Sequence, residues 1–399
     1  KMINFKDLNE YVILNIFEYC TDNDLENLYL VCRRFRDLIE HCIYYRRSLD
    51  VVMSGCCKRN NGRTFNTLSY RDRLRISRNW CDGRYKEYFF FHHPKWYRCR
   101  IALEKNSIFL SYRGQIRSHK RSKVEMIERR NWKEISEPNK EDISDFVKKG
   151  DSIFAGRTNG SCFVYEDGVI TEQKLHDLKE YLTCVDFQDH IFVTSSDKTT
   201  KLWNKTSELG LIEFELIKDY HEPYKCLRVS HDGEKIACGK YIDRTRRALC
   251  EIDIETGIKQ VFNSDTSSIY NLLYKTDDVI LTAHYDTSLR LFDKRTNRDE
   301  LIWMDPFDAS VYCLEYDGLY GVVCGMQYHC RVNLYDLRIP KKHCQMFFPI
   351  LRKSRGSPVY SIACDCQYLY IATDSDLRAF DFKVDWAQSR DYRNIFVRV

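Results

Sequence analysis

Cysteine and histidine are the residues of this sequence that could hold a metal ion, but their spacing does not favour a metal site. Cys364 and Cys366 form a Cys-x-Cys pair within an alternating strand pattern, and no second cysteine pair flanks them. Zinc sites in proteins combine such pairs from two segments of the chain. The neighbours Cys56 and Cys57, and likewise His92 and His93, are poorly spaced to chelate one ion. We therefore expect neither a metal nor a cofactor.

Catalytic sequence motifs are also missing. The sequence has no Gly-x-x-x-x-Gly-Lys phosphate loop, no Gly-x-Ser-x-Gly nucleophile turn and no His-Glu-x-x-His pattern. Each of these motifs places a nucleophile, a phosphate cradle or a metal at a defined turn or helix. The sequence therefore predicts a protein that binds other molecules without a catalytic centre of its own.

One stretch is rich in positive charge. Residues 112–133, YRGQIRSHKRSKVEMIERRNWK, interleave arginine and lysine with aromatic residues, a composition found in nucleic-acid-binding segments. The formal net charge is only +5, against 63 basic and 58 acidic residues. Solvated charge on an outer strand or loop is the simpler interpretation, so binding to nucleic acid remains an alternative that we do not favour.

The cysteines also indicate a cellular compartment. Most of the 18 cysteines stand singly inside apolar strings, as do Cys184, Cys226, Cys313 and Cys324. Buried, reduced thiols of this kind are typical of intracellular proteins. No apolar run approaches the roughly 20 residues that a membrane span needs, and the opening KMINFKDLNE lacks the apolar core of a secretory signal. We expect a cytoplasmic and/or nuclear protein without a membrane partner.

Residues 5–45 have the periodicity of short amphipathic helices. Val12, Ile13, Ile16 and Phe17 are spaced to form one apolar face. A second periodic stretch follows a capping residue, Thr21 or Asp22, and contains Leu25, Leu28, Val31, Cys32 and Phe35. A bundle of this size has a small core, and we expect a partner or a neighbouring domain to cover its apolar surface.

The string VCRRF at Val31, together with this apolar spacing, resembles an F-box. The family's usual proline is replaced by Asn9, and Tyr44-Tyr45-Arg46 stands where the family often has Leu-Trp-Arg. The resemblance implies that the apolar face binds a Skp-type adaptor, which in turn holds a cullin. The residues expected to contact the adaptor are Leu8, Ile13, Ile16, Phe17, Leu25, Leu28, Val31, Cys32 and Phe35.

From residue 86 onward a pattern recurs every 40 to 50 residues. In each repeat a polar turn residue precedes an aromatic residue by six positions, as in Asn159/Tyr165, Asp197/Trp203, Asp286/Phe292, His329/Tyr335 and Asp374/Phe380. The repeats resemble the WD-repeat family, in which each unit is a four-stranded blade that stacks into a ring. Seven units can be counted if YFFFHH from Tyr88 and the strands from Ile101 form one irregular unit. We expect the turn aspartates and the aromatic residues to be structural.

These segments together predict a mainly β protein: a small α-helical F-box domain at 1–47, a helical linker at 48–85 and a seven-bladed WD-repeat β-propeller at 86–399. The order resembles the F-box/WD-repeat family, most of all its dactylin branch in LRISRNW from Leu74 and SPVYSIA from Ser357. That resemblance implies a non-catalytic, substrate-recognition subunit of a Skp–cullin–F-box ubiquitin ligase. The alternatives are a propeller scaffold that does not enter a cullin complex, and a nucleic-acid-binding propeller.

A substrate site is predicted where the first strands begin and the second-to-third-strand turns meet the channel mouth. Blades five to seven place tyrosines at these positions, and a neighbouring blade places a lysine there: Tyr270, Tyr285, Tyr312, Tyr328, Tyr360 and Lys225. Tyrosine offers a large contact area and few rotors, so this group could hold an apolar, aromatic or methylated side chain of a protein substrate. Alternatively, the tyrosines pack on one another and only cap the channel. Phosphopeptide binding ranks lower, because Lys225, with Arg157 and Lys198 near it, supplies few cations.

Overall fold

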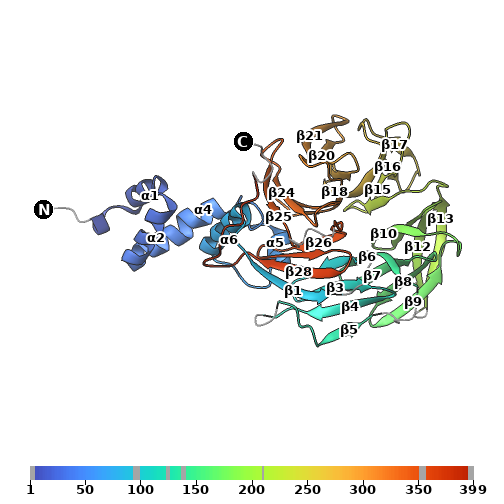
Figure 1. The fold of residues 1–399 in the computed structure, drawn as a ribbon, viewed down its shortest axis with the longest axis horizontal. Helices are drawn as coiled ribbons and strands as arrows, with labels where there is room; N and C mark the ends of the chain where they lie inside the picture. Colours follow the sequence, from blue (N-terminus) through green and yellow to red (C-terminus); the bar gives the residue numbers. More distant parts are fainter. Residues whose placement is uncertain are drawn as a thin grey trace.

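The computed structural model describes residues 5–92, 99–122, 126–135, 141–208, 211–349 and 356–393. Within them, a group of helices leads into seven four-stranded antiparallel sheets arranged as a ring (Figure 1). The predicted seven-bladed propeller with a small helical domain before it is confirmed. In the described part of the chain, no helix combines the length and the apolar character that crossing a bilayer requires.

The N-terminal helical domain is built from short helices with polar caps. Its elements are η1 (Phe5–Asp7), α1 (Glu10–Glu18), α2 (Asp22–Val31), α3 (Arg33–Leu38), η2 (Ile39–Tyr44) and α4 (Tyr45–Ser48). Asn9 caps α1 by accepting a 2.9 Å hydrogen bond from the Tyr11 amide. Thr21 and Asp24 form a reciprocal capping box at the start of α2. Asn9 thus performs a helix-capping role at the position where a proline was expected.

Two further helices connect this domain to the ring. They are α5 (Lys58–Arg63) and α6 (Tyr70–Asp82). α6 begins at the Ser69 cap and ends at Gly83, which has a φ of 64°. A side chain at Gly83 would meet the carbonyl oxygen of Arg390 at 2.4 Å, so both the dihedral and the close approach of the C-terminal segment require glycine.

The first four blades follow one another along the chain, each with its inner strand first. Their strands are β2 (Ile101–Leu103), β3 (Ser107–Tyr112), β4 (Gln115–Lys120) and β5 (Trp132–Glu134); β6 (Ile143–Lys149), β7 (Ser152–Arg157), β8 (Ser161–Glu166) and β9 (Val169–Lys174); β10 (Leu182–Gln188), β11 (Ile191–Ser196), β12 (Thr200–Glu208) and β13 (Leu211–Asp219); β14 (Cys226–Val229), β15 (Lys235–Gly239), β16 (Leu249–Asp253) and β17 (Lys259–Val261).

The last three blades repeat this arrangement, except that the seventh takes its outer strand from the start of the ring. Their strands are β18 (Ile269–Thr276), β19 (Val279–His284), β20 (Ser288–Asp293) and β21 (Arg298–Met304); β22 (Val311–Tyr316), β23 (Gly321–Met326), β24 (Val332–Asp336) and β25 (His343–Phe347); β26 (Ser361–Cys364), β27 (Tyr368–Ala372), β28 (Asp376–Asp381) and β1 (Lys86–His92).

The position of β1 corrects the predicted first unit. YFFFHH was placed in one unit with the strands from Ile101, but β1 pairs with β28, with Lys86 opposite Asp381 and His92 opposite Asp376. From β6 onward, neighbouring inner strands contact each other in chain order; β3 of the first blade contacts β6, and β26 contacts β2. Pairing the first strand with the last blade closes the ring and leaves no exposed edge at the junction of the two chain ends. β1 and β28 lie side by side in Figure 1.

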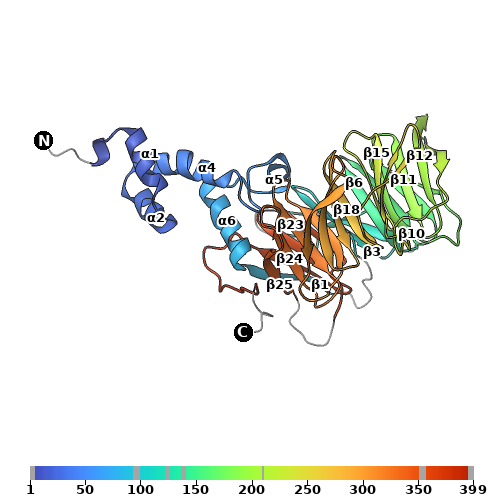
Figure 2. The same ribbon diagram turned by 90° about the horizontal axis from the view of Figure 1, so that it is seen from above.

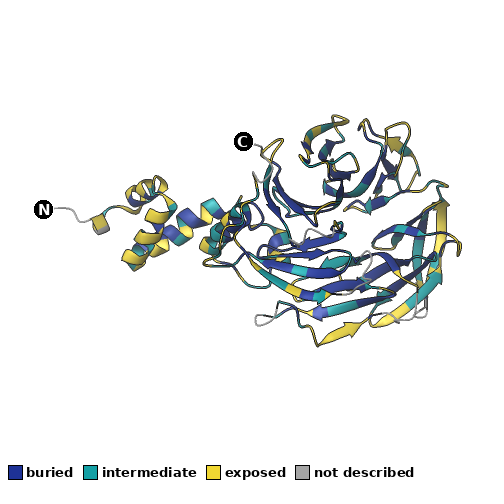
Figure 3. Ribbon diagram, in the orientation of Figure 1, coloured by how far each residue is buried: buried dark blue, intermediate teal, exposed yellow. Residues whose placement is uncertain are grey.

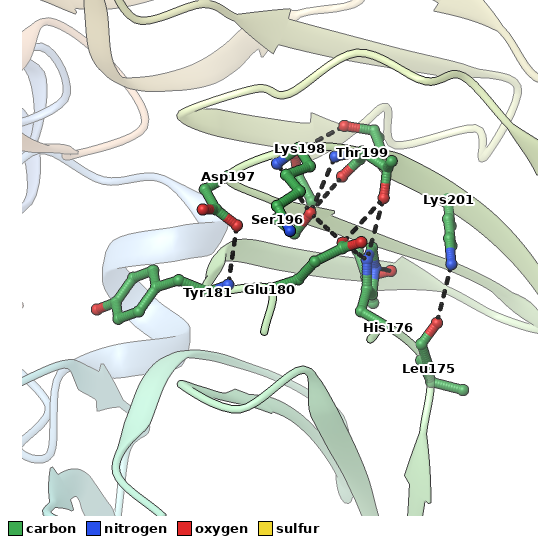
Figure 4. A network of polar contacts seen from close by, with 12 residues as sticks. Leu175, His176, Glu180, Tyr181, Ser196, Asp197, Lys198, Thr199 and Lys201 are labelled. Carbon is green, nitrogen blue, oxygen red and sulfur yellow. Dashed lines mark hydrogen bonds and ion pairs between the residues drawn. The ribbon is translucent and has the colours of Figure 1, made fainter. Parts of the chain in front are cut away.

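The core lies between adjacent blades. Second and third strands are largely buried, whereas the residues of outer strands such as β9 are exposed or half-buried (Figure 3). One blade also has a buried polar network (Figure 4). His176 Nε2 lies 2.7 Å from Thr194 Oγ1, which accepts a 2.9 Å hydrogen bond from the Trp203 indole. His176 Nδ1 lies 2.9 Å from the Glu180 carboxylate.

The turn aspartate of this blade is structural, as predicted. Asp197 Oδ1 accepts a 2.9 Å hydrogen bond from the Tyr181 amide, which joins the turn to the segment entering β10. The aromatic residues that close the third strands are buried in four of the five predicted pairs, and only Tyr165 is partly exposed. The sequence repeat therefore encodes the blades themselves, and the binding surfaces have to be sought elsewhere.

The linker shares a hydrophobic core with the last two blades. Ile76 and Trp80 of α6 are fully buried in a cluster that includes Phe347 and Phe382. The Trp80 ring stacks on Phe382 at 3.7 Å between centroids, and its indole nitrogen donates to the Cys366 carbonyl at 2.9 Å. The helical domain therefore projects from the ring on a packed helix, as Figure 2 shows.

Candidate functional site

The nine residues predicted to contact an adaptor fall into two groups in the structure. Ile13, Phe17, Leu25 and Phe35 are buried in the core of the helical domain, and Leu8, Leu28 and Cys32 pack against that core. The prediction that the first four form a contact surface is wrong, because their side chains are covered by the domain itself. Ile16 and Val31 are the two members that remain exposed.

Further apolar side chains are exposed beside these two. Val12, Ile16 and Tyr19 follow the one-face spacing of a helix along α1, and Tyr19 is 91% exposed. Leu30 and Val31 are exposed at the end of α2. We call these five residues the α1–α2 patch. Val12, Tyr19 and Leu30 were not among the predicted contact residues. For Val12 the reason is that α1 has two adjacent apolar stripes, and only packing decides which of them faces inward.

Four of the five predicted tyrosines form one aromatic group. The Tyr270 ring lies 4.7 Å from Tyr312 and 6.1 Å from Tyr285, and Tyr312 lies 6.1 Å from Tyr360. Tyr328 instead packs against His329 at 6.4 Å, and among the described residues it has no ring contact with the other four. Sequence reasoning therefore located the group correctly, except that Tyr328 stands apart from it.

A fifth tyrosine completes the group. Tyr241, which is 51% exposed, lies 5.9 Å from Tyr270 between ring centroids. It belongs to the long β15–β16 loop around Arg244. This loop departs from the repeat pattern, so the pattern did not predict Tyr241 as a binding residue. We call Tyr241, Tyr270, Tyr285, Tyr312 and Tyr360 the tyrosine face. Burial, together with the neighbouring tyrosines, raises the pKa of Tyr270 above its usual range, so its hydroxyl stays neutral at physiological pH.

The predicted cations differ in their availability. Lys225 is partly buried beside this group, at the start of β14, and its amide donates to the Gly239 carbonyl at 2.8 Å. Arg157 is buried, donates to the carbonyls of Gly114 and Glu141, and pairs with Glu172 at 3.1 Å. Arg157 is therefore committed to the fold, which weakens the phosphopeptide alternative further.

The linker contacts the ring at the end of the strands that lies away from the tyrosine face. Tyr312 is the second residue of β22, whereas Glu315 near the end of this strand pairs with Arg59 and Arg63 of α5. Burial favours the neutral acid, but the two guanidinium groups outweigh it and lower the pKa of Glu315. With a rise of about 3.3 Å per residue, Tyr312 and Glu315 are about 10 Å apart along the strand. The tyrosine face and the helical domain therefore lie on different ends of the propeller.

The structure also addresses the residues considered for metal binding. Cys364 and Cys366 are fully buried, and burial raises the pKa of each thiol to about 12. Such thiols resist the deprotonation that metal binding needs. Among the residues that the structure describes, no group of three or more histidine, cysteine, aspartate or glutamate side chains could hold an ion. His93 lies outside those residues.

The basic stretch at 112–133 is partly engaged in internal contacts. The Arg117 guanidinium lies 4.3 Å from the Tyr112 ring and 4.4 Å from the Trp132 ring. Arg121 is buried in an ion pair with Asp365. Residues 123–125 lie outside the described part of the chain. The arginines at positions 117 and 121 thus stabilise the first blade and its junction with the seventh.

Comparisons with known proteins agree with this architecture. A family model described as F-box-like matches residues 10–50. The human F-box/WD repeat-containing protein 4 is 25% identical over 388 residues, which cover 94% of this chain and 92% of the human protein. The mouse protein of the same name is 24% identical over 387 residues, covering 94% of this chain and 93% of its own length.

A solved structure supports the fold alone. The computationally designed Ika8 protein superimposes with a TM-score of 0.52 at 14% sequence identity, over 70% of this chain and 82% of the designed one. The F-box-like match coincides with the helical domain, and the two curated relatives match along both the helices and the ring. This chain is therefore similar to the F-box/WD repeat-containing proteins along nearly its whole length.

Proposed function

We propose that this protein is the substrate-recognition subunit of a Skp–cullin–F-box type ubiquitin ligase. F-box domains in general bind Skp-type adaptors, which lead to a cullin. The observation that carries the proposal is the α1–α2 patch, a set of large apolar side chains exposed on a domain with a small core. Exposed apolar groups of this kind mark protein-binding surfaces. The propeller would then recruit the protein to be ubiquitinated, and partner enzymes would supply catalysis.

The linker supports this role because it fixes the distance between the two ends of the molecule. Asn79 of α6 donates to the carbonyls of Phe382 and Val384 at 2.8 and 3.0 Å. Ser389 Oγ donates to the Asp82 carbonyl at 2.6 Å, so the C-terminal segment holds the end of the helix. A receptor with such a linker holds its substrate in a defined orientation, which raises the effective concentration of the reacting groups.

The cytoplasm and/or the nucleus is the location that we propose. All 18 cysteines are free thiols, and most are buried. Reduced thiols persist in these compartments.

The adaptor-binding step can be tested with a matched pair of triple variants. In the test variant, Ile16, Leu30 and Val31 are each changed to aspartate. In the control, the comparably exposed Ile170, Leu178 and Val169 of the propeller are changed in the same way. Because three charges would have to be buried against the adaptor, we expect affinity to fall at least about a hundredfold in the test variant only. The measurement is calorimetric titration of the purified chain with a Skp-type adaptor.

Two results would contradict the proposal. Unchanged adaptor binding by the test variant would show that the α1–α2 patch is not the contact surface. Absence of binding by the wild-type chain would favour the alternative of a propeller scaffold outside cullin complexes. Phe17 is left intact in this design because its side chain is fully buried, and an aspartate there would unfold the domain.

A further inference from the structure

The β15–β16 loop, residues 240–248, extends the tyrosine face with a second kind of side chain. Besides Tyr241, it exposes Ile242, whose side chain is 65% accessible. Ile242 has a φ of 59°, in the left-handed region that branched residues strongly disfavour. Glycine or asparagine would relieve this strain, so the fold alone gives no reason to present an exposed isoleucine here. A contact with a partner molecule would give one.

The loop is held in place by the segment that leads into Tyr270. The Asp243 amide donates to the Ser267 carbonyl at 2.7 Å, and the Ile242 amide donates to Ser268 Oγ at 2.8 Å. On the other side, the Thr266 amide donates to the Arg246 carbonyl at 3.0 Å. These hydrogen bonds order the loop before any ligand arrives, which lowers the entropic cost of binding.

The loop itself carries more basic than acidic residues. It contains Lys240, Arg244, Arg246 and Arg247 but one acidic residue, Asp243. Lys240 pairs with Glu222 at 3.2 Å, and Arg246 pairs with Asp265 at 2.5 Å in an exposed contact of the kind that contributes little to stability. Within the described residues, the guanidinium groups of Arg244 and Arg247 have no ion-pair partner, and both side chains are exposed.

We infer that the tyrosine face and this loop together bind a linear protein segment that has one large apolar anchor flanked by aspartate or glutamate. The anchor contacts Tyr241, Tyr270 and Tyr285, and the carboxylates lie along Arg244 and Arg247. A methylated lysine side chain is disfavoured as the anchor, because it is itself positively charged and, among the described residues, the unpaired side chains of the loop are arginines. A phosphate group favours several arginines that converge in one desolvated pocket, whereas here the guanidinium groups are spread along an exposed loop. This inference rests on the proposed function and names its substrate class.

The experiment selects binders from a random 12-residue peptide library displayed on phage, with the full-length chain as target. We expect enriched sequences to combine an aromatic residue or leucine with aspartate or glutamate within three positions. The best enriched peptide is then synthesised, and its affinity is measured by fluorescence polarisation at low and high salt. Because carboxylates contribute to binding, affinity should weaken as salt rises.

Variants then locate the bound peptide. We expect Tyr285→Ala, and separately the double variant Arg244→Gln/Arg247→Gln, to weaken binding at least about tenfold; the arginine variant should also flatten the salt dependence. The controls are Tyr11→Ala on the helical domain, whose side chain is 72% exposed and is not part of the α1–α2 patch, and Arg295→Gln/Arg298→Gln at the other end of the strands of the fifth blade. Thermal melting of every variant separates loss of binding from loss of folding.

The inference is overturned if no peptide is enriched, if enriched peptides are basic or uncharged, or if they bind the loop and tyrosine variants as tightly as wild type. Adaptor capture is measured on the same samples. Acidic peptides that bind a chain unable to capture the adaptor would overturn the proposed function and leave the peptide site standing. Adaptor capture by a chain that enriches no acidic peptide would overturn the peptide site and leave the proposed function standing.

Discussion

Individual buried residues set the response of this protein to acid. His284 is fully buried between two hydroxyls, with Nδ1 2.8 Å from Thr266 Oγ1 and Nε2 2.7 Å from Thr282 Oγ1. Burial, reinforced by the nearby Arg290 charge, lowers its pKa to about 3. Burial also lowers the pKa of His176 in the polar network of the third blade. Both rings are therefore neutral in the folded protein at physiological pH.

This neutrality predicts a loss of stability in weak acid. Below the ordinary histidine pKa of about 6.5, the unfolded chain takes up protons that the folded chain refuses, so the free energy of unfolding falls as the pH falls. The loss from His284 amounts to about 1.4 kcal/mol per pH unit while the folded ring stays neutral. Urea unfolding between pH 7 and pH 4.5 measures this slope. His284→Gln should reduce this slope by up to one proton, and an unchanged slope would contradict the assignment to His284.

At the level of single elements, α6 decides how firmly the helical domain is held on the ring. Trp80 is fully buried, stacks on Phe382 and donates to the Cys366 carbonyl. Tyr70, at the start of the same helix, contacts Tyr45 of α4 at 5.1 Å between ring centroids. α6 therefore contacts the helical domain at one end and the sixth and seventh blades at the other.

Truncation of Trp80 should weaken this connection. We expect Trp80→Ala to lower the free energy of unfolding by about 3–5 kcal/mol, because a large buried ring and a buried hydrogen bond are lost. Trp386→Ala is the control, since that ring is 85% exposed and its loss should cost less than about 0.5 kcal/mol. Guanidinium unfolding measures both values. Equal effects from the two substitutions would show that α6 does not share the core of the ring.

At the level of the whole molecule, closure by β1 makes the stability of the first and seventh blades interdependent. Phe90 of β1 is buried in a cluster that contains Leu103 and Ile108 of the first blade and Tyr370 and Leu377 of the seventh. Its neighbour on the same strand, Phe89, points outward and is 43% exposed. Adjacent residues of one strand point to opposite faces of the sheet. Substitutions at Phe90 and Phe89 therefore change the same strand, but only the Phe90 substitution removes a side chain from the core that the two blades share.

We expect Phe90→Ser to destabilise the protein by about 3 kcal/mol or more, and Phe89→Ser by much less. Hydrogen exchange should show faster opening in β2–β4 and in β26–β28 together, because the lost side chain belongs to a core that both blades share. Faster exchange in β1 alone would contradict this coupling and would indicate that the last blade is complete with three strands.

The repeat pattern determined most of the fold. Alternating apolar strands and polar turns at a regular spacing can bury their faces only by stacking side by side, so the propeller follows from the local sequence. The helical domain was predictable for the same reason, since its caps and apolar spacing are local properties. The tyrosines of blades five to seven were found because equivalent positions in repeats occupy equivalent places in the ring. The sequence also indicated the structural role of Asp197 correctly.

Only the tertiary structure decided which side chains face outward and which segments meet. α1 has two adjacent apolar stripes, and packing against α2 and α3 buried Ile13 and Phe17 while leaving Val12 and Ile16 exposed. β1 lies at the start of the ring in sequence but completes its last blade, because a closed ring satisfies both edges. Tyr241 joined the tyrosine face through a loop that departs from the repeat. Periodicity specifies the elements, but contacts between residues distant in sequence are fixed only when the ring closes and the helices pack.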